Sequence, residues 1–277
     1  MQIIERISDL QDALRGETSI GFVPTMGYLH EGHESLLERA RAENDIVVLS
    51  IFVNPTQFGP NEDLDRYPRD AERDQAIARS AGVDYLFFPT TETMYPYDMA
   101  RVSVRTGDDV LCGASRPGHF DGVLTVVSKL FNIVRPARAY FGLKDAQQLA
   151  LIEGYVRDYF VPVEIVRCPI IREEDGLAKS SRNVYLTETE RREAPLIQQA
   201  LLHANGMFAS GKGVLEVVEE TRGRLARIAG TTIDYVEAVD YPSLKAVSED
   251  TKTILLAVAV HFSGARLIDN LLYTRGA

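Results

Sequence analysis

The feature that most constrains the fold is a nearly continuous run of β-branched and apolar residues from Asp45 to Val53. A strand that is apolar at successive positions is expected to be buried on both faces, as in the centre of a parallel sheet. Shorter apolar runs are found at Ser19–Val23, Tyr85–Phe88, Ala139–Phe141 and Val161–Val166. We expect the first of these strands to end at Pro24, because proline cannot donate a hydrogen bond to a neighbouring strand.

Segments with apolar residues at helical spacing lie between those runs, at Glu34–Glu43, Arg69–Ser80, Val123–Val134 and Asp145–Tyr159. Strands that alternate with helices imply right-handed crossovers between parallel strands. The predicted fold class is therefore α/β, with a doubly wound parallel sheet of the Rossmann-like kind.

Towards the C-terminus the order changes, because helices precede strands instead of alternating with them. Thr187 and Glu190 have the spacing of a capping box, which predicts a helix from there to about His203. A second helix and three strands are expected near Val214–Ile228, Thr232–Val239, Thr253–His261 and Arg266–Asp269. We therefore predict two domains, a Rossmann-like ligand-binding domain over residues 1–172 and a smaller α+β domain over residues 173–277 that acts as a lid.

Composition and charge exclude several classes of partner. The 277 residues carry a formal net charge of −10 and the pI is about 5.1, which opposes broad binding to nucleic acid or to an anionic membrane. The N-terminal residues do not form a secretory signal, and no apolar stretch is long enough to span a bilayer. Two cysteines, Cys112 and Cys168, are too few and too far apart for a disulfide framework. These features predict a reduced, cytoplasmic protein that binds neither nucleic acid nor membrane.

The segment from Thr25 to His33 follows the first predicted strand and leads into a helix. In an open α/β sheet, ligands bind at the carboxyl ends of strands, where a helix N-terminus offers unpaired N–H groups to phosphate. Gly27 and Gly32 would let the main chain approach a nucleotide, and His30 and His33 can donate hydrogen bonds to phosphate oxygens. An alternative interpretation is a plain turn with two exposed histidines. A zinc site is disfavoured, because these histidines are three residues apart instead of four.

Three further segments carry polar groups that suit a phosphate-rich ligand. After a predicted strand, Lys144 could neutralise phosphate and Asp145 could hold Mg²⁺. The segment Lys179–Asn183 places two hydroxyls between two cations, as in a polyphosphate clamp. Asn54 and Gln57 bring two neutral amides to the same sheet edge. Taken singly, each segment has another interpretation. Lys144 and Asp145 also fit the start of a helix, Lys179–Asn183 fits a solvated loop, and Asn54 with Gln57 fits a capped turn.

Together, and in this order, the motifs resemble those of the pantothenate synthetase (pantoate–β-alanine ligase) family of the nucleotidyltransferase superfamily. Pro24–Gly27 with His30–His33 resembles the H-I-G-H signature, and Lys179–Asn183 resembles K-M-S-K-S. Matches also occur at Phe52–Gly59, Arg116–Phe120 and Gly142–Gln148. The resemblance covers nearly the whole chain and implies the nucleotidyltransferase type of Rossmann-like fold.

The resemblance implies an ATP-dependent ligase, acting as a homodimer with Mg²⁺, that joins pantoate to β-alanine through a pantoyl-adenylate and releases pyrophosphate and AMP. The residues implied in ATP binding are Met26, Gly27, Tyr28, Leu29, His30, Glu31, Gly32, His33, Gly142, Leu143, Lys144, Asp145, Ile171, Lys179, Ser180, Ser181 and Arg182. Asn54, Gln57 and Gln148 are implied in binding pantoate and β-alanine, and Asp145 in binding Mg²⁺. Catalysis is assigned to His30, His33, Lys144 and Arg182, with His33 as proton donor. Lys179 stands where the family usually has an apolar residue.

Three other functions remain as alternatives. A related nucleotidyltransferase could stop at a nucleotidyl product, although Gln57, Gln148 and the large second domain count against it. A nucleotide-binding sensor without turnover would keep the fold but not the chemistry. A zinc hydrolase built on His30 and His33 lacks a third ligand at a convincing spacing.

Overall fold

The structure is a computed structural model that describes residues 1–60, 62–97 and 99–276. The chain forms two compact units. Unit 1 contains Met1–Arg105, Arg116–Leu143 and Leu151–Pro169, and unit 2 contains Thr106–Ser115, Lys144–Ala150 and Ile170–Ala277. Each unit therefore contains segments that are far apart in the sequence, and the domain boundary expected at residue 172 stays a prediction.

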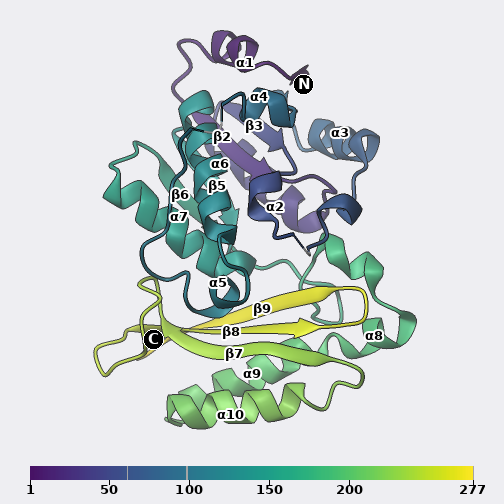
Figure 1. The fold of residues 1–277 in the computed structure, drawn as a ribbon, viewed down its shortest axis with the longest axis vertical. Coiled ribbons are helices and arrows are strands. Elements are labelled where there is room, and N and C mark those ends of the chain that lie inside the picture. The colour runs from purple at the N-terminus through teal and green to yellow at the C-terminus, as the bar shows by residue number, and fades with distance from the viewer. Residues whose placement is uncertain (61, 98, 277) are drawn as a thin grey trace. The chain divides into compact units, whose positions relative to one another are not determined.

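Unit 1 is built on a six-stranded parallel sheet with the strand order β1-β4-β3-β2-β5-β6. Figure 1 labels β2, β3, β5 and β6 of this sheet. The strands are β1 (Gln2–Ile4), β2 (Ile20–Thr25), β3 (Ile46–Ile51), β4 (Tyr85–Phe87), β5 (Arg138–Gly142) and β6 (Glu164–Cys168). The run that begins at Asp45 forms β3, which has a strand on each side and is almost entirely buried. The predicted α/β fold class with a parallel sheet is confirmed.

Strand β2 continues through Pro24, so the expectation that the strand ends there is wrong. The Thr25 carbonyl accepts a hydrogen bond from Phe52 N–H at 3.0 Å, so Thr25 faces β3. Successive residues of a parallel strand point their main-chain groups to opposite neighbours, so Pro24 faces β5. The pairing of β2 with β5 ends at Phe22, and Pro24 therefore removes no donor that the ladder needs.

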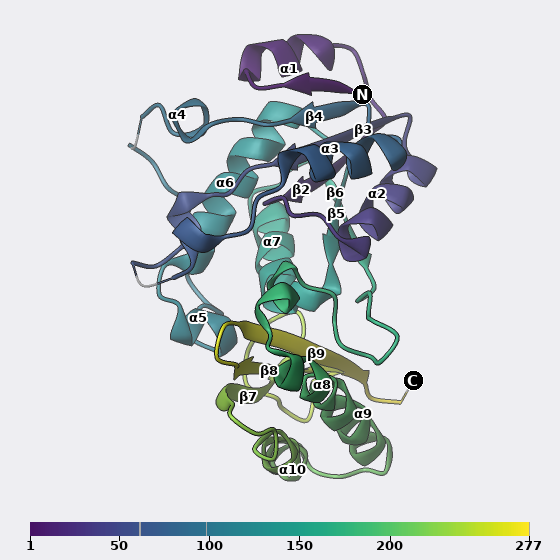
Figure 2. The same ribbon diagram turned by 90° about the vertical axis from the view of Figure 1, so that its right-hand side faces the viewer.

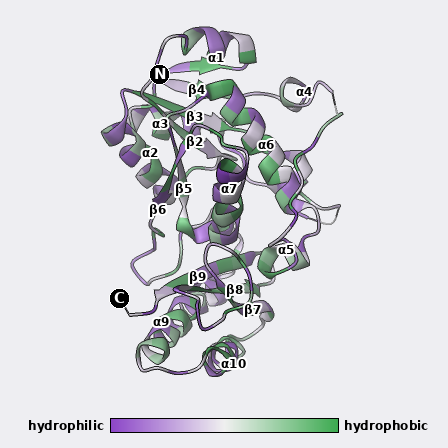
Figure 3. Ribbon diagram, turned by 90° about the vertical axis from the view of Figure 1, so that its left-hand side faces the viewer, coloured by the Kyte–Doolittle hydropathy of each residue, from purple (hydrophilic) through white to green (hydrophobic). Residues whose placement is uncertain are grey.

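Helices cover both faces of this sheet. Figure 2 shows α2 (Glu31–Glu43) and α3 (Ala71–Ser80) on one face and α6 (His119–Val134) on the other. Helix α2 begins at Glu31, three residues earlier than predicted, because His30 caps it. Figure 3 colours α2 both purple and green, as expected for a helix with one buried face.

The other helices before β6 are short or contain residues of both units. They are α1 (Ile7–Ala13), α4 (Thr91–Met94), α5 (Leu111–Ser115) and α7 (Ala146–Asp158). The core of unit 1 includes Leu37 of α2, Leu49 of β3 and Leu86 of β4, which are fully buried. Every helix among the described residues is too short or too polar to cross a membrane.

Unit 2 contains an antiparallel sheet in the order β7-β8-β9. Its strands are β7 (Thr232–Asp240), β8 (Thr253–His261) and β9 (Arg266–Thr274). Helix α9 (Leu196–Ala209) packs on β9, and α10 (Val214–Leu225) packs on β7. Their apolar faces and the buried residues of β8 form one core, which gives the predicted smaller α+β arrangement.

The single helix predicted from Thr187 to His203 is wrong, because the structure has two helices there. Helix α8 covers Glu188–Glu193, and α9 starts at Leu196, directly after Pro195. Proline has no N–H to continue the hydrogen bonds of α8, so the first helix ends before it. The capping box itself is confirmed, since Thr187 and Glu190 each bond the other's main chain.

Glu190 provides a test of this local structure at acid pH. Hydrogen bonds from the main-chain N–H groups of Ser263 and Thr187 lower the pKa of its carboxyl from the ordinary 4.5 to about 2. Its stabilising effect is therefore complete above pH 4.5 and is lost as the pH falls through 2. We expect Glu190→Gln to be less stable at neutral pH and to show a weaker loss of stability between pH 4.5 and 2. Denaturant unfolding at several pH values would reveal this, and parallel curves for both proteins would contradict it.

Candidate active site

The turn between β2 and α2 is held by a carboxylate that belongs to no sequence motif. Gly27 and Tyr28 have positive φ angles of 84° and 51°. Asp74 of α3 accepts hydrogen bonds from the main-chain N–H groups of Tyr28 at 2.8 Å and Leu29 at 2.7 Å. A Cβ on residue 27 would lie 2.9 Å from an Asp74 oxygen, so both φ and space require glycine. Burial raises the pKa of the Asp74 carboxyl despite these two hydrogen bonds.

The two motif histidines are oriented by the N-terminus of α2. Nδ1 of His30 accepts from Gly32 N–H at 3.1 Å, and Nδ1 of His33 accepts from His30 N–H at 3.3 Å. A ring nitrogen that accepts a hydrogen bond carries no proton, so each neutral imidazole has its proton on Nε2. Both histidines are therefore suited to donate a hydrogen bond from Nε2 beside the positive end of a helix dipole.

Gln57, in the turn η1 (Pro55–Gln57), has a side-chain amide whose orientation follows from the main chain. Asn54 Nδ2 donates to the carbonyl of Gly122 at 3.1 Å, which identifies the donor end of the Asn54 amide. The same Nδ2 donates to Gln57 Oε1 at 3.0 Å, and Gln57 Nε2 points to the sulfur of Met26, also at 3.0 Å. Because sulfur is a weak acceptor, Gln57 Nε2–H suits a stronger acceptor such as a carboxylate.

Asn54 is 1% exposed, and its amide groups are bonded within unit 1. Its Oδ1 accepts from the hydroxyl of Tyr95 at 2.7 Å and from that of Thr56 at 3.0 Å. In the structure, Asn54 therefore orients the side-chain amide of Gln57. Its direct contact with a substrate stays a prediction.

Gly122 of α6 allows this arrangement, because a Cβ there would lie 2.3 Å from the Thr56 carbonyl oxygen. We expect Gly122→Ala to displace η1 and to lower the free energy of unfolding by about 1–3 kcal/mol. Gly223→Ala is the matched control, since Gly223 is also helical and a Cβ there meets nothing within 4 Å. The control should gain up to about 1 kcal/mol in urea unfolding. Equal stability changes in the two variants would refute the steric argument.

Lys144 and Asp145 lie in the turn η3 (Leu143–Asp145), directly after Gly142 ends β5. The main-chain carbonyl of Lys144 accepts a hydrogen bond from Asn270 Nδ2 of β9 at 2.9 Å. The side chain of Lys144 is partly exposed and that of Asp145 is exposed. The main chain is anchored within unit 2 while both charged groups remain accessible to a ligand.

The two glutamines that follow differ in environment. Gln147 is buried, and its Nε2 donates to the carbonyls of Gly107 and Val110, both at 2.8 Å. Gln148, the predicted substrate residue, comes next in α7 and is partly exposed. Gln147 therefore stabilises unit 2, and Gln148 is the member of the pair that can reach a ligand.

The Lys179–Asn183 segment is less basic than its formal charge indicates. Nζ of Lys179 lies 2.6 Å from Glu173, and both side chains are mostly buried. The Lys179 N–H also donates to the Ile171 carbonyl at 2.9 Å. Ser180 caps the turn η4 (Ser181–Tyr185) by accepting from Arg182 N–H at 3.3 Å, and the following serine is buried. The ion pair therefore offsets the positive charge of Lys179.

The structure brings together predicted residues of β2, η1 and the start of α2. Met26 contacts Gln57, and the two motif histidines have ring centroids 4.1 Å apart. Leu29 is fully buried, so only its main chain can take part in binding, whereas Glu31 is exposed at the start of α2. Sequence reasoning missed Asp74, for which no motif or spacing provides a signal.

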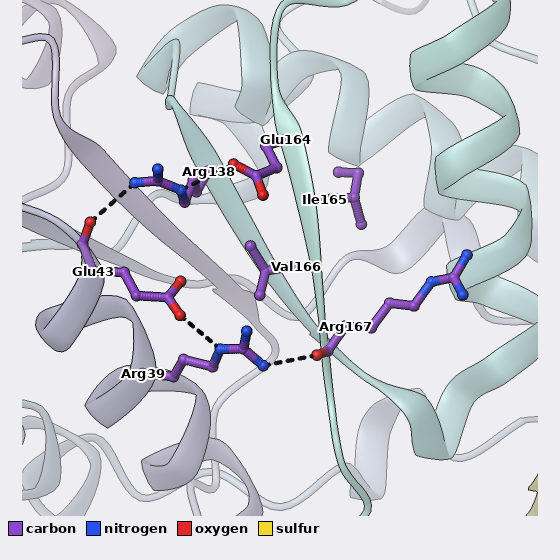
Figure 4. Close-up of a pocket in the computed structure, with 7 residues that line it drawn as sticks. All are labelled: Arg39, Glu43, Arg138, Glu164, Ile165, Val166 and Arg167. Atoms are coloured by element: carbon purple, nitrogen blue, oxygen red, sulfur yellow. Dashed lines mark hydrogen bonds and ion pairs between the residues drawn. The ribbon is translucent and has the colours of Figure 1, made fainter.

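A shallow pocket of about 600 Å³ lies elsewhere on unit 1 (Figure 4). It is lined by Arg39, Glu43, Arg138, Glu164, Ile165, Val166 and Arg167. Arg39 pairs with Glu43 at 3.0 Å and Arg138 with Glu164 at 3.0 Å, so these charges already have partners. None of the predicted site residues is among its lining residues, and we do not assign it to the substrates.

The sequence matches a model of the family described as Pantoate-beta-alanine ligase over residues 2–272. The chain belongs to this family. A pantothenate synthetase from Exiguobacterium sibiricum is 74% identical over 277 residues, with all of both chains covered. One from Bacillus cereus is 53% identical over 280 residues, with 99% of each chain covered. The resemblance inferred from the motifs is confirmed.

Solved structures of the family have the same fold. A pantothenate synthetase from Thermus thermophilus superposes with a TM-score of 0.93 at 49% identity, covering 98% of this chain and 99% of that one. A pantoate-beta-alanine ligase from Francisella tularensis, complexed with beta-gamma ATP and beta-alanine, superposes with a TM-score of 0.81 at 37% identity. That match covers 98% of this chain and 97% of the other.

Proposed function

We propose that this chain is an ATP-dependent ligase that joins pantoate to β-alanine through a pantoyl-adenylate. Membership of the family over nearly the whole chain supports this activity. The observation that carries it is the pair of neutral histidines, His30 and His33, each with Nε2–H as donor at the start of α2. Neutral donors at a helix N-terminus suit phosphate oxygens.

In the first proposed step, an oxygen of the pantoate carboxylate attacks the α-phosphorus of ATP, and pyrophosphate leaves. In the second step, the amine of β-alanine attacks the acyl carbon, loses a proton and displaces AMP. Neither step needs a nucleophile from the protein. The residues of this chain would therefore act by positioning the reactants and by stabilising charge on the phosphates.

Each group of the chain has a role that follows from its chemistry. The Nε2–H of Gln57 would orient the pantoate carboxylate without the strong ion pair that would reduce its nucleophilicity. His30 and His33 would donate to phosphate oxygens, with His33 as the proposed proton donor. Lys144 and Arg182, as cationic side chains, would stabilise the charge that develops on pyrophosphate. The other predicted ATP-binding residues keep their assignment in this proposal.

Mg²⁺ would enter with ATP. Among the described residues there is no group of three or more His, Cys, Asp or Glu side chains that could hold a metal ion. Mg²⁺ that binds with a nucleotide takes only one or two carboxylates from the protein and completes its shell with phosphate oxygens and water. The exposed carboxylate of Asp145 fits that limited requirement, and the ion would neutralise phosphate charge.

The proposed function is tested by mixing the protein with ATP, Mg²⁺ and pantoate and following pyrophosphate and AMP with and without β-alanine. With pantoate alone, we expect release of one equivalent of pyrophosphate, while the pantoyl-adenylate stays bound to the protein. Continuous release of AMP is expected only when β-alanine is added. Turnover with CTP would favour a nucleotidyltransferase. Binding of ATP without turnover would favour a sensor, and a requirement for zinc would favour a hydrolase.

Two further predictions remain part of the proposal. The resemblance implies a homodimer, which light scattering on the purified protein would test. The reduced, cytoplasmic state is proposed from cysteine usage, and both Cys112 and Cys168 are buried free thiols in the structure.

A further inference from the structure

The segment Arg116–Phe120 matches the family but has no role in the function proposed above. It leads into α6, and two of its side chains reach the turn that carries Gln57. His119 Nδ1 lies 2.7 Å from the main-chain carbonyl oxygen of Gln57, and Arg116 Nη2 lies 3.4 Å from the same oxygen. Both residues therefore contact the main chain of the proposed pantoate-binding residue.

The partners of His119 determine its protonation. A carbonyl oxygen can only accept a hydrogen bond, so Nδ1 must carry the proton. Arg116 Nη1 lies 3.0 Å from Nε2, and a guanidinium can only donate, so Nε2 must be unprotonated. His119 is thus neutral with its proton on Nδ1, the opposite tautomer to that of His30 and His33.

Arg116 is in turn held by Glu62. Its Nε lies 2.7 Å from one carboxylate oxygen of Glu62 and its Nη2 lies 2.6 Å from the other. The side chains are 20% and 25% exposed, so the bidentate pair is largely shielded from water. Burial raises the pKa of the Glu62 carboxyl, but the hydrogen bonds and the positive charge of Arg116, together with smaller contributions from other groups, hold the pKa below its ordinary value. The pair is therefore ionised at neutral pH.

We propose that Arg116 and His119 are positioning residues that hold the main chain of Gln57 where its Nε2–H meets the pantoate carboxylate. Asn54 sets the orientation of the Gln57 amide, and Arg116 with His119 sets the place of its main chain. The inference rests on the proposed function, because it takes Gln57 as a contact of pantoate. A misplacement of about 1 Å at a residue that positions a reacting group can cost about 10²-fold in reaction rate.

Kinetics of His119 variants test the proposal. His119→Ala should raise the KM for pantoate about tenfold, roughly the effect of one lost hydrogen bond, and leave the KM for ATP within about twofold. His119→Asn should recover most of the affinity, because its side-chain N–H can still donate to the Gln57 carbonyl. A merely structural defect would lower the amount of active enzyme and leave both KM values unchanged. An unchanged pantoate KM in His119→Ala would overturn the proposal.

Two exposed residues serve as matched controls. His203→Ala removes a histidine of unit 2 that is 41% exposed, and Arg157→Ala removes an arginine that is 71% exposed. Arg116→Ala, like His119→Ala, should raise the KM for pantoate, whereas neither control should change it. A rise of the same size in the controls would overturn the proposal.

The tautomer provides a readout that needs no substrate. The protein has five histidines, so the ¹⁵N spectrum of histidine-labelled protein is simple, and the signal absent from His119→Asn belongs to His119. We expect the Nδ1–H tautomer near neutral pH. The Nε2–H tautomer or an imidazolium would overturn the hydrogen-bond chain. If the protein shows the expected tautomer but does not use pantoate, the proposed function is refuted. The hydrogen bonds of His119 would then stand, and only the claim that they position Gln57 for pantoate would fall.

Discussion

Lys144→Ala is expected to lower pantoate-dependent pyrophosphate release by about 10²–10³-fold, the usual loss when one group that stabilises transition-state charge is removed. The main-chain carbonyl of Lys144 is anchored by Asn270, so the truncation should remove the ammonium group without moving the turn. The fall should be in kcat more than in the KM for pantoate, because the charge on the departing pyrophosphate develops in the transition state.

The control for this variant is Lys212→Ala. Lys212 is half exposed and pairs with the half-exposed Glu216, four residues along the chain. Such a surface pair contributes little, so removing Lys212 should change stability by about 0.5 kcal/mol at most. Pyrophosphate release and urea unfolding would be measured on both variants. A wild-type rate of pantoate-dependent pyrophosphate release in Lys144→Ala would remove this residue from the proposed mechanism.

Asp74→Ala is expected to lower the free energy of unfolding by about 3 kcal/mol, because two main-chain N–H groups in or near the core lose a charged acceptor. The turn that these groups belong to has two successive residues with positive φ, so it has little tendency to form without them. The KM for ATP should rise in the folded fraction, since the same turn is proposed to bind the nucleotide.

Asp74→Asn should have an intermediate effect. Its Oδ1 can still accept from Leu29, but its Nδ2 would meet the N–H of Tyr28, which is also a donor. Asp158→Ala is the control, because that carboxylate is 68% exposed and pairs with its sequence neighbour Arg157. Urea unfolding and ATP titration on the three variants would test whether the loss of stability is largest in Asp74→Ala, smaller in Asp74→Asn and smallest in Asp158→Ala. Equal stability of Asp74→Ala and Asp158→Ala would contradict the role given to Asp74.

Local patterns predicted the elements of this chain better than their ends. The apolar run at Asp45–Val53 correctly indicated a central parallel strand, and the capping box at Thr187 correctly indicated a helix start. Helix α2 begins three residues before its predicted start and β9 ends five residues after its predicted end. Two other errors concern proline. Its effect depends on where the missing N–H would point: Pro24 faces a side of β2 where the ladder has ended, whereas Pro195 interrupts the hydrogen bonds of a helix.

The site residues, like the helices and strands, were predicted only in part. The motifs identified His30, His33 and Gln57 because their chemistry and their place after strands are visible in the sequence. Asp74 was missed because it lies 46 residues from Tyr28, the residue it holds, in a helix with no motif. The Arg116–Phe120 segment was recognised as a match, but its contact with Gln57 spans about 60 positions and had no local signal.

By itself, then, the sequence determined the alternation of strands and helices, the family and the residue types available for the chemistry, because these depend on periodicity and on side chains alone. The tertiary structure decided the strand order, the orientation of the Gln57 amide and the tautomers of His30, His33 and His119. Those properties depend on which donor or acceptor is packed against each group. For Gln57 and His119 these partners come from distant parts of the chain and are set only when the sheet and its helices assemble. The partners of His30 and His33 lie within three residues and are set when α2 begins.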